Sequence, residues 1–159
     1  MLTLKLLMLA LLANGTPVLV KRLLGQRFSR PVDGGLRFID GQPLFGRSKT
    51  LRGIVVAVPV TSAGAWLMEL GWEIGALFGA ASLTGDLLSS FSKRRMKLAP
   101  SSRATGLDQI PEVLLPLLVC QPLLELTVLQ IVAVVVLFFA SDVFLSPLFF
   151  RLKIRDRPY

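Results

Sequence analysis

A stretch near the middle of the chain, "GDLLSSFSKRR" at residues 85–95, carries the side chains best suited to chemistry. Its polar residues recur at i, i+4, i+7 and i+8, the spacing of one helical face, and they are Asp86, Ser90, Lys93 and Arg94. A carboxylate on that face can bind a divalent cation, and the cationic side chains can bind phosphate oxygens. The spacing therefore predicts a site that acts on a phosphate compound.

Two more acidic residues follow shortly after this stretch. Asp108 and Glu112 are four residues apart, so they share a face of the next predicted helix. The polar segment between the two helices, residues 93–106, is short, which makes the helices antiparallel neighbours. We therefore expect carboxylates from two helices to meet. The simpler alternatives are that Asp86 pairs with a neighbouring cation and that "SKRR" only anchors a helix at a membrane surface.

The residue types present restrict the chemistry further. The chain has no histidine and a single cysteine, Cys120, which excludes a histidine base, a Cys/His zinc site and an intrachain disulfide. Close carboxylates repel one another unless they share a proton or a metal ion. Oxygen ligands alone suit Mg²⁺, which binds through one or two carboxylates and substrate phosphates. We predict a Mg²⁺ site built from Asp86, Asp108 and Glu112.

The composition indicates how these residues are positioned. The chain has 159 residues, of which 53% are hydrophobic, and a formal net charge of +8. A bilayer core about 30 Å thick requires about 20 consecutive apolar residues in a helix. Five segments meet this requirement, which predicts an all-α integral membrane protein with one membrane domain over 1–159; they are residues 2–20, 54–72, 74–92, 107–124 and 126–150.

The basic residues are distributed unevenly around these segments. The polar stretches 21–53, 93–106 and 151–159 hold 8, 5 and 4 of the 18 Lys and Arg residues, and only Lys5 lies elsewhere. Cytoplasmic segments of membrane proteins are enriched in Lys and Arg. The pattern predicts an outside N-terminus, a cytoplasmic C-terminus and a multi-pass protein of the cytoplasmic membrane. No nucleic-acid recognition motif accompanies the basic residues, so nucleic acid is not an expected partner.

Polar residues of four predicted helices lie at a similar depth below the cytoplasmic surface. At about 1.5 Å per residue, Asn14 and Asp86 lie about 9 Å inside their helix ends, and Asp142 lies about 12 Å inside. Asp108 and Glu112 are at the surface and about one turn below it. Ionisable groups in a bilayer usually face a cavity, a partner or an ion. This layer predicts a polar cavity on the cytoplasmic side.

The longest polar segment, residues 21–53, is rich in Gly, Pro and Asp-Gly, which predicts a folded cytoplasmic loop rather than a long helix. Within it, residues 36–45 are predicted to form a small hairpin that turns near Asp40 and Gly41. The following motif, "GRSKTLRG", does not have P-loop spacing. Its backbone amides and polar side chains are nevertheless candidates for phosphate binding, the side chains being Lys49, Thr50 and Arg52.

"GDLLSSFSKRR" followed by "GLDQIPE" resembles the signature of the membrane cytidylyltransferases that make CDP-activated lipids. The family pattern is G-D-L-x-x-S-x-x-K-R, then D-[RQ]-x-D at the start of the next helix. The first part matches at Gly85, Asp86, Leu87, Ser90, Lys93 and Arg94. The chain is most similar to the CDP-archaeol synthase branch, through its length, "ANGTPVL", "DGQPLFGRSKTLRG" and the basic end "RPY". Its second acidic residue, Glu112, stands one position later than in the pattern and is one methylene longer.

The resemblance implies a magnesium-dependent nucleotidyltransferase of phospholipid biosynthesis. Its expected substrates are CTP and an unsaturated archaeal ether-lipid phosphate, 2,3-bis-O-geranylgeranylglycerol 1-phosphate, and its expected products are a CDP-lipid and pyrophosphate. The residues expected to be catalytic are Asp86, Asp108 and Lys93. Those expected to bind the lipid phosphate or the nucleotide are Lys49, Thr50, Arg52, Ser90, Lys93, Arg94 and Asn14. Asn14 and Asp142 are expected to shape the floor of the cavity.

Two other functions are open at this point. A phosphatidate cytidylyltransferase would use the same chemistry on ester lipids, although such enzymes are generally longer. A small cation transporter would use the carboxylates as its ion site, but it should present polar groups along a complete path, often with repeat symmetry. The outer halves of the predicted helices consist mainly of Leu, Val and Ala, which favours the enzyme.

Overall fold

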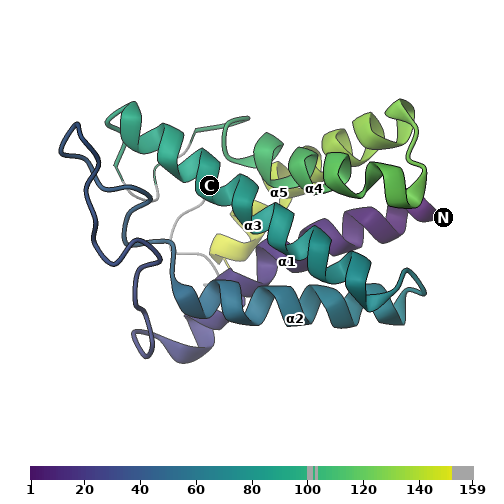
Figure 1. The fold of residues 1–159 in the computed structure, drawn as a ribbon, viewed down its shortest axis with the longest axis horizontal. Coiled ribbons are helices and arrows are strands. Elements are labelled where there is room, and N and C mark those ends of the chain that lie inside the picture. The colour runs from purple at the N-terminus through teal and green to yellow at the C-terminus, as the bar shows by residue number, and fades with distance from the viewer. Residues whose placement is uncertain (100–101, 103, 152–159) are drawn as a thin grey trace.

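The computed structural model describes residues 1–99, 102 and 104–151, the last seven of these by their backbone alone. These residues form five helices and no strand (Figure 1). The helices are α1 Leu2–Leu24, α2 Leu51–Leu67, α3 Trp72–Arg95, α4 Gln109–Leu124 and α5 Val128–Arg151. The predicted all-α class is confirmed. The basic residues 152–159, with "RPY", and Arg103 lie outside the described residues.

Consecutive helices run antiparallel and pack against one another, and α5 returns beside α1. Figure 1 shows the polar segment 25–50 at the same end of the molecule as the segment between α3 and α4. We call this the loop end. The short turns 68–71 and 125–127 lie at the opposite end, which we call the turn end. The arrangement places the basic segments together, as the sequence predicts, wherever the structure describes them.

Two of the helices, α1 and α3, are long and apolar enough to cross a bilayer. The shorter α2 and α4, and residues 128–144 of α5, are apolar as well. Their lengths of 17 and 16 residues, for α2 and α4, are slightly below the about 20 residues that a full crossing requires. Five membrane crossings therefore stay a prediction.

The first helix is longer than predicted, since it continues to Leu24 rather than ending at residue 20. Lys21 and Arg22 lie in its last turn, where positive charge interacts favourably with the helix dipole. Gly25 then adopts a positive φ of 53°, a conformation that glycine reaches without strain, and the helix stops.

The second helix begins three residues earlier than predicted and ends five residues earlier, at Leu67 rather than 72. Thr50 is extended and precedes the first turn, so the helix starts directly after the "GRSKT" motif. At the other end the chain reverses through Glu69 and Gly71, whose φ angles are 59° and 90°. The Lys5 amine donates a hydrogen bond of 2.6 Å to the Met68 carbonyl there. This contact gives a structural role to Lys5, the basic residue that lies outside the three basic stretches of the sequence.

The helices approach closely where small residues meet. A Cβ on Gly75 would lie 2.6 Å from the Thr61 carbonyl oxygen of α2, and one on Gly79 would lie 3.2 Å from the Thr61 Cβ. Small residues at four-residue spacing permit this approach between apolar helices. The apolar core beside them joins α1, α3, α4 and α5 and includes Leu6, Leu9, Phe78, Val113, Leu117 and Val134.

The loop 25–50 is folded, as predicted, although it contains only isolated bridges. One bridge joins Arg37 and Pro43 in antiparallel fashion. Beside it the Phe38 amide donates to the Gln42 carbonyl at 2.8 Å, and the Leu44 amide donates to the Leu36 carbonyl at 3.1 Å. This confirms the predicted hairpin, with Asp40 and Gly41 at its turn.

Candidate active site

The site begins at the closest approach of α3 and α4. A Cβ on Gly85 would lie 2.1 Å from the Pro111 carbonyl oxygen and 3.0 Å from the Glu112 Cα. Only a residue without a side chain allows the two backbones this separation. The glycine of the G-D-L motif therefore brings the start of α4 against α3 at the position next to Asp86.

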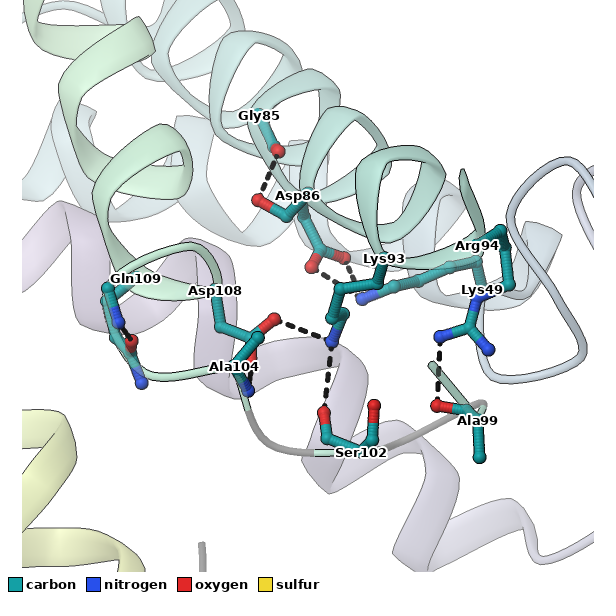
Figure 2. A network of polar contacts seen from close by, with 12 residues as sticks. Lys49, Gly85, Asp86, Lys93, Arg94, Ala99, Ser102, Ala104, Asp108 and Gln109 are labelled. Carbon is teal, nitrogen blue, oxygen red and sulfur yellow. Dashed lines mark hydrogen bonds and ion pairs between the residues drawn. The ribbon is translucent and has the colours of Figure 1, made fainter. Parts of the chain in front are cut away.

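Two carboxyl groups meet at this contact. The carboxyl groups of Asp86 on α3 and Glu112 on α4 lie within interaction distance of one another. The Lys49 amine, which comes from the loop 25–50, lies 2.5 Å from the Asp86 carboxylate (Figure 2). Three segments that are far apart in the sequence thus contribute to one polar cluster.

The charge state of Lys49 follows from these neighbours. Burial by itself would lower the pKa of its amine, but the neighbouring acidic groups, Asp86 first and then Glu112, outweigh burial and hold that pKa above its usual value. Lys49 is therefore a cation at neutral pH. The sequence placed it among phosphate-binding residues but gave no sign that it contacts Asp86, because a loop position carries no helical periodicity.

A second lysine–aspartate pair lies beside the first, at the loop end of α3. The Lys93 amine is 2.6 Å from the Asp108 carboxylate and 3.2 Å from the Ser102 carbonyl oxygen (Figure 2). Asp108 also accepts a 2.9 Å hydrogen bond from the Ala104 amide. These contacts fasten the described part of the segment between α3 and α4 to the end of α3.

The predicted common face of α3 is confirmed. Ser90, Lys93 and Arg94 are all buried, and Figure 2 shows Asp86, Lys93 and Arg94 on the same side of the helix. The Arg94 guanidinium donates a hydrogen bond of 2.9 Å to the Ala99 carbonyl. Its Nε is buried and has no hydrogen-bond partner among the residues that the structure describes, so this donor can serve a ligand.

Three further predicted binding residues lie outside the two lysine–aspartate pairs. The Arg52 guanidinium is buried at the start of α2 and donates to the Arg27 carbonyl. Thr50 precedes the first turn of α2 without capping it through its side chain. The Asn14 amide donates to the Ala10 carbonyl of its own helix at 3.0 Å. Their predicted contacts with substrate stay predictions.

A further contact that the sequence analysis did not predict joins α4 to α5. The Gln109 amide donates a 2.8 Å hydrogen bond to the Asp142 carboxylate, while its oxygen accepts from the Gly106 amide at 2.8 Å. The glutamine of the "DQIPE" motif thus joins the start of α4 to α5. The position of Gln109 within the acidic "DQIPE" motif could have marked it as a site residue. Sequence spacing within one helix does not, however, reveal a partner on another helix.

The predicted metal triad is not assembled among the described residues, where no group of three or more acidic, His or Cys side chains is gathered as a metal site would require. Asp86 and Glu112 meet, whereas Asp108 faces Lys93. The two carboxyl groups that meet, those of Asp86 and Glu112, are suitable ligands for Mg²⁺. They offer only oxygen atoms, and two carboxyl groups in contact must share either a proton or a cation.

The family of the chain follows from comparison with known proteins. The model of the CarS-like family of CDP-archaeol synthases matches residues 60–159. The chain is 32% identical over 158 residues to the CDP-archaeol synthase of Sulfurisphaera tokodaii, covering 94% of this chain and 90% of that one. The chain belongs to the CDP-archaeol synthase family.

Other members of the CDP-archaeol synthase family agree in sequence and fold. The Pyrobaculum calidifontis CDP-archaeol synthase is 35% identical over 130 residues, covering 79% of this chain and 77% of that one. A solved structure of an intramembrane enzyme for archaeal membrane lipid biosynthesis superposes with a TM-score of 0.70 at 31% identity, covering 87% of this chain and 91% of that one. The resemblance read from "GDLLSSFSKRR" is thereby confirmed over most of the chain.

Proposed function

We propose that this protein transfers the cytidylyl group of CTP to an unsaturated archaeal ether-lipid phosphate, 2,3-bis-O-geranylgeranylglycerol 1-phosphate, giving a CDP-lipid and pyrophosphate. Membership of the CDP-archaeol synthase family supports the reaction class. The observation that carries the proposal to this chain's own residues is the meeting of Asp86 and Glu112 beside the Lys49 amine. Here phosphate charge can be neutralised by the Lys49 ammonium on one side and by a cation bound to the two carboxyl groups on the other.

In this reaction an oxygen of the lipid phosphate attacks the α-phosphorus of CTP. The new phosphorus–oxygen bond forms as the bond from the α-phosphorus to the bridging oxygen breaks, and pyrophosphate leaves with that electron pair. Phosphoryl-type transfer depends on positioning and on stabilising charge rather than on covalent help from the protein. A site of carboxylates, lysines and an arginine, in a chain without histidine, suits that requirement.

The cationic residues are assigned to the phosphates. Lys49 and Lys93 each contact a carboxylate in this structure, and each can exchange that contact for phosphate oxygens when substrate arrives. Arg94 lies beside them, its buried Nε has no partner within the described part of the chain, and it is assigned the same role. Ser90 lies on the same face and orients one phosphate oxygen. Thr50, Arg52 and Asn14 are assigned to the walls of the substrate site around these phosphate-binding residues.

Mg²⁺ is proposed as the cofactor, held by Asp86 and Glu112, where it would neutralise charge on the triphosphate and the departing pyrophosphate. Asp108 becomes available as a further ligand once Lys93 turns to a phosphate. A carboxylate pair from two helices and the oxygen-only set of ligands support this assignment.

The site is proposed to lie at the cytoplasmic face of the cell membrane. In this arrangement the chain crosses the bilayer five times, with the N-terminus outside and the loop end in the cytoplasm. The gathering of 8 and 5 basic residues in the stretches 21–53 and 93–106 supports this orientation. CTP then reaches the site from the cytosol, while the lipid tails stay among the apolar helices.

The test is to incubate the purified protein with each of the four nucleoside triphosphates, Mg²⁺ and either the archaeal ether-lipid phosphate or phosphatidate. Mass spectrometry identifies the products. We expect a nucleotidyl-lipid only with CTP and the ether lipid, and its loss when EDTA removes Mg²⁺. Absence of any nucleotidyl-lipid from a folded, helical preparation would contradict the proposal. Equal use of phosphatidate would replace the lipid assignment with the ester-lipid alternative.

A further inference from the structure

The third cation of the "SKRR" sequence has a different environment from the first two. Arg95, the last residue of α3, packs between the rings of Phe38 and Phe91, with its guanidinium carbon 4.7 Å from each ring centroid. The two rings meet edge to face, 5.4 Å apart. Arg95 therefore faces the loop 25–50 rather than the carboxylates of the candidate active site.

Hydrogen bonds complete this cluster. Arg95 is 2.9 Å from the Asp40 carboxylate and donates a 2.6 Å hydrogen bond to the Pro43 carbonyl. Phe38, Asp40 and Pro43 all belong to the hairpin in the loop 25–50, whereas Phe91 belongs to α3. The planar guanidinium thus joins the hairpin to the loop end of α3 by packing against two aromatic rings and by contacting two oxygen atoms. We call this group of five residues the Arg95 clamp.

A continuous series of contacts leads from the Arg95 clamp to Lys49. The buried Asp33 carboxylate accepts hydrogen bonds from the Phe45 and Gly46 amides, both at 3.0 Å, immediately after the hairpin. The Gly46 carbonyl then accepts from the Lys49 amide at 3.2 Å. The path of the loop from residue 38 to residue 49 is therefore fixed by side-chain and backbone contacts along its length.

We propose that Arg95 is a positioning residue, which holds the hairpin against α3 and thereby presents the Lys49 amine to the Asp86 site. Its effect on catalysis rests on the proposed function, but its effect on Lys49 does not. An ammonium in place of the guanidinium would keep the charge and lose the fork geometry and the planar stacking. The clamp therefore requires arginine rather than any cation.

The first test is a double-mutant cycle on cytidylyl transfer, with full-length protein in lipid bilayers. The variants are Arg95→Met, Lys49→Met, the double variant, and Lys97→Met as a matched control, since Lys97 is an exposed cation two residues after Arg95. We expect Arg95→Met to lower kcat/KM about tenfold or more, because misplacing a group by roughly 1 Å can cost on the order of 100-fold. Lys97→Met should match the wild type.

The cycle separates positioning from a merely structural effect. If Arg95 acts through Lys49, the double variant should be no less active than Lys49→Met alone, because residues in one network have non-additive effects. Arg95→Lys should recover only part of the activity. Multiplicative losses in the double variant, or wild-type activity of Arg95→Met, would overturn the proposal.

The second test needs no catalysis. A soluble acylating reagent labels lysine amines, and mass spectrometry compares Lys49 with Lys93 in the same molecule. We expect Arg95→Met to raise labelling of Lys49 several-fold while Lys93, held by Asp108, is unchanged. Phe38→Leu removes one ring of the clamp at a 40% exposed position and should raise Lys49 labelling in the same direction if Arg95→Met does not fold.

The activity assay and the lysine-labelling experiment test different statements, so one can give a negative result without the other. A wild-type protein that makes no CDP-lipid would contradict the proposed function, and the labelling experiment would still decide the role of Arg95. Unchanged Lys49 labelling in folded Arg95→Met, or in Phe38→Leu where Arg95→Met does not fold, would overturn the positioning role whatever the activity.

Discussion

The two lysine–aspartate pairs at the loop end of the molecule have nearly the same geometry and different surroundings. Lys49 and Asp86 are 2.5 Å apart, and Lys93 and Asp108 are 2.6 Å apart. The aspartate side chains are 20% and 23% exposed, so burial does not distinguish them. What differs is the third group. Asp86 contacts a second carboxyl, whereas Asp108 contacts a backbone amide.

This difference assigns the two pairs to different tasks. The first cluster has two acidic groups and one cation, so a proton or a metal ion must complete it. The second pair has one acidic group and one cation, so in this structure its charges and its neighbouring backbone groups satisfy one another, and Asp108 becomes available only when Lys93 turns to a phosphate. An ion pair within a family motif is therefore not in itself evidence of a metal site. The excess of acid over base beside Asp86 is the feature that points to a ligand.

The largest effect is expected from Asp86→Asn. It removes the negative charge that the proposed metal and Lys49 both need, and we expect cytidylyl transfer to fall by at least about 1,000-fold, as for loss of a group that organises transition-state charge. The variant should remain helical and membrane-inserted. Product assays and circular dichroism check both expectations. A fully active Asp86→Asn enzyme would remove the metal assignment.

The next largest effect is expected from separating the helices that form the first cluster. In Gly85→Ala the new methyl group would overlap the Pro111 carbonyl, so α3 and α4 must move apart and Glu112 must leave Asp86. We expect activity to fall on the order of 100-fold, the cost of a displacement of roughly 1 Å. Gly15→Ala is the matched control, since no atom of the described residues lies within 4 Å of its added Cβ. Equal effects of the two substitutions would show that the close approach is unimportant.

A smaller effect on activity, and a clear one on stability, is expected from Asp108→Asn. Its carboxylate binds Lys93 and the Ala104 amide, so the variant should lose about 1 to 3 kcal/mol of unfolding free energy through weakened, partly unsatisfied hydrogen bonds. Denaturation and kinetics measured on the same samples check this. Should Asp108→Asn lose as much activity as Asp86→Asn while keeping its stability, the distinction between the two pairs would be wrong.

The smallest effect is expected from Asp33→Asn, which changes a buried carboxylate whose bonded groups are the amides of Gly35, Phe45 and Gly46. Burial raises the pKa of Asp33, but these hydrogen bonds outweigh it and hold the pKa below its ordinary value of 3.8. The carboxylate therefore stabilises the fold above pH 3.8, and this contribution is lost as the pH falls through the lower folded-state pKa. We expect Asp33→Asn to have a lower Tm at pH 7 and the difference to shrink in acid. A difference that is constant with pH would contradict this account.

Much of the architecture was predictable from particular residues. The spacing of Asp86, Lys93 and Arg94 predicted a shared face because helical geometry depends only on positions within one segment. The hairpin turning at Asp40 and Gly41 was predictable because turns are likewise local. The end of α2 was predicted wrongly, since the largely apolar sequence resumes after Glu69 and continues to Trp72, while the backbone already reverses at Glu69.

The sequence by itself determined the helical class, the family, and the gathering of acids and cations at one end of the molecule. These follow from hydrophobic length, charge distribution and helical periodicity, which are local properties. Only the tertiary structure decided that Glu112 rather than Asp108 meets Asp86, that Lys49 pairs with Asp86, and that Arg95 faces the loop. Those pairings depend on how closely two helices approach at Gly85 and on the folded path of a loop, and neither is encoded in spacing along one segment.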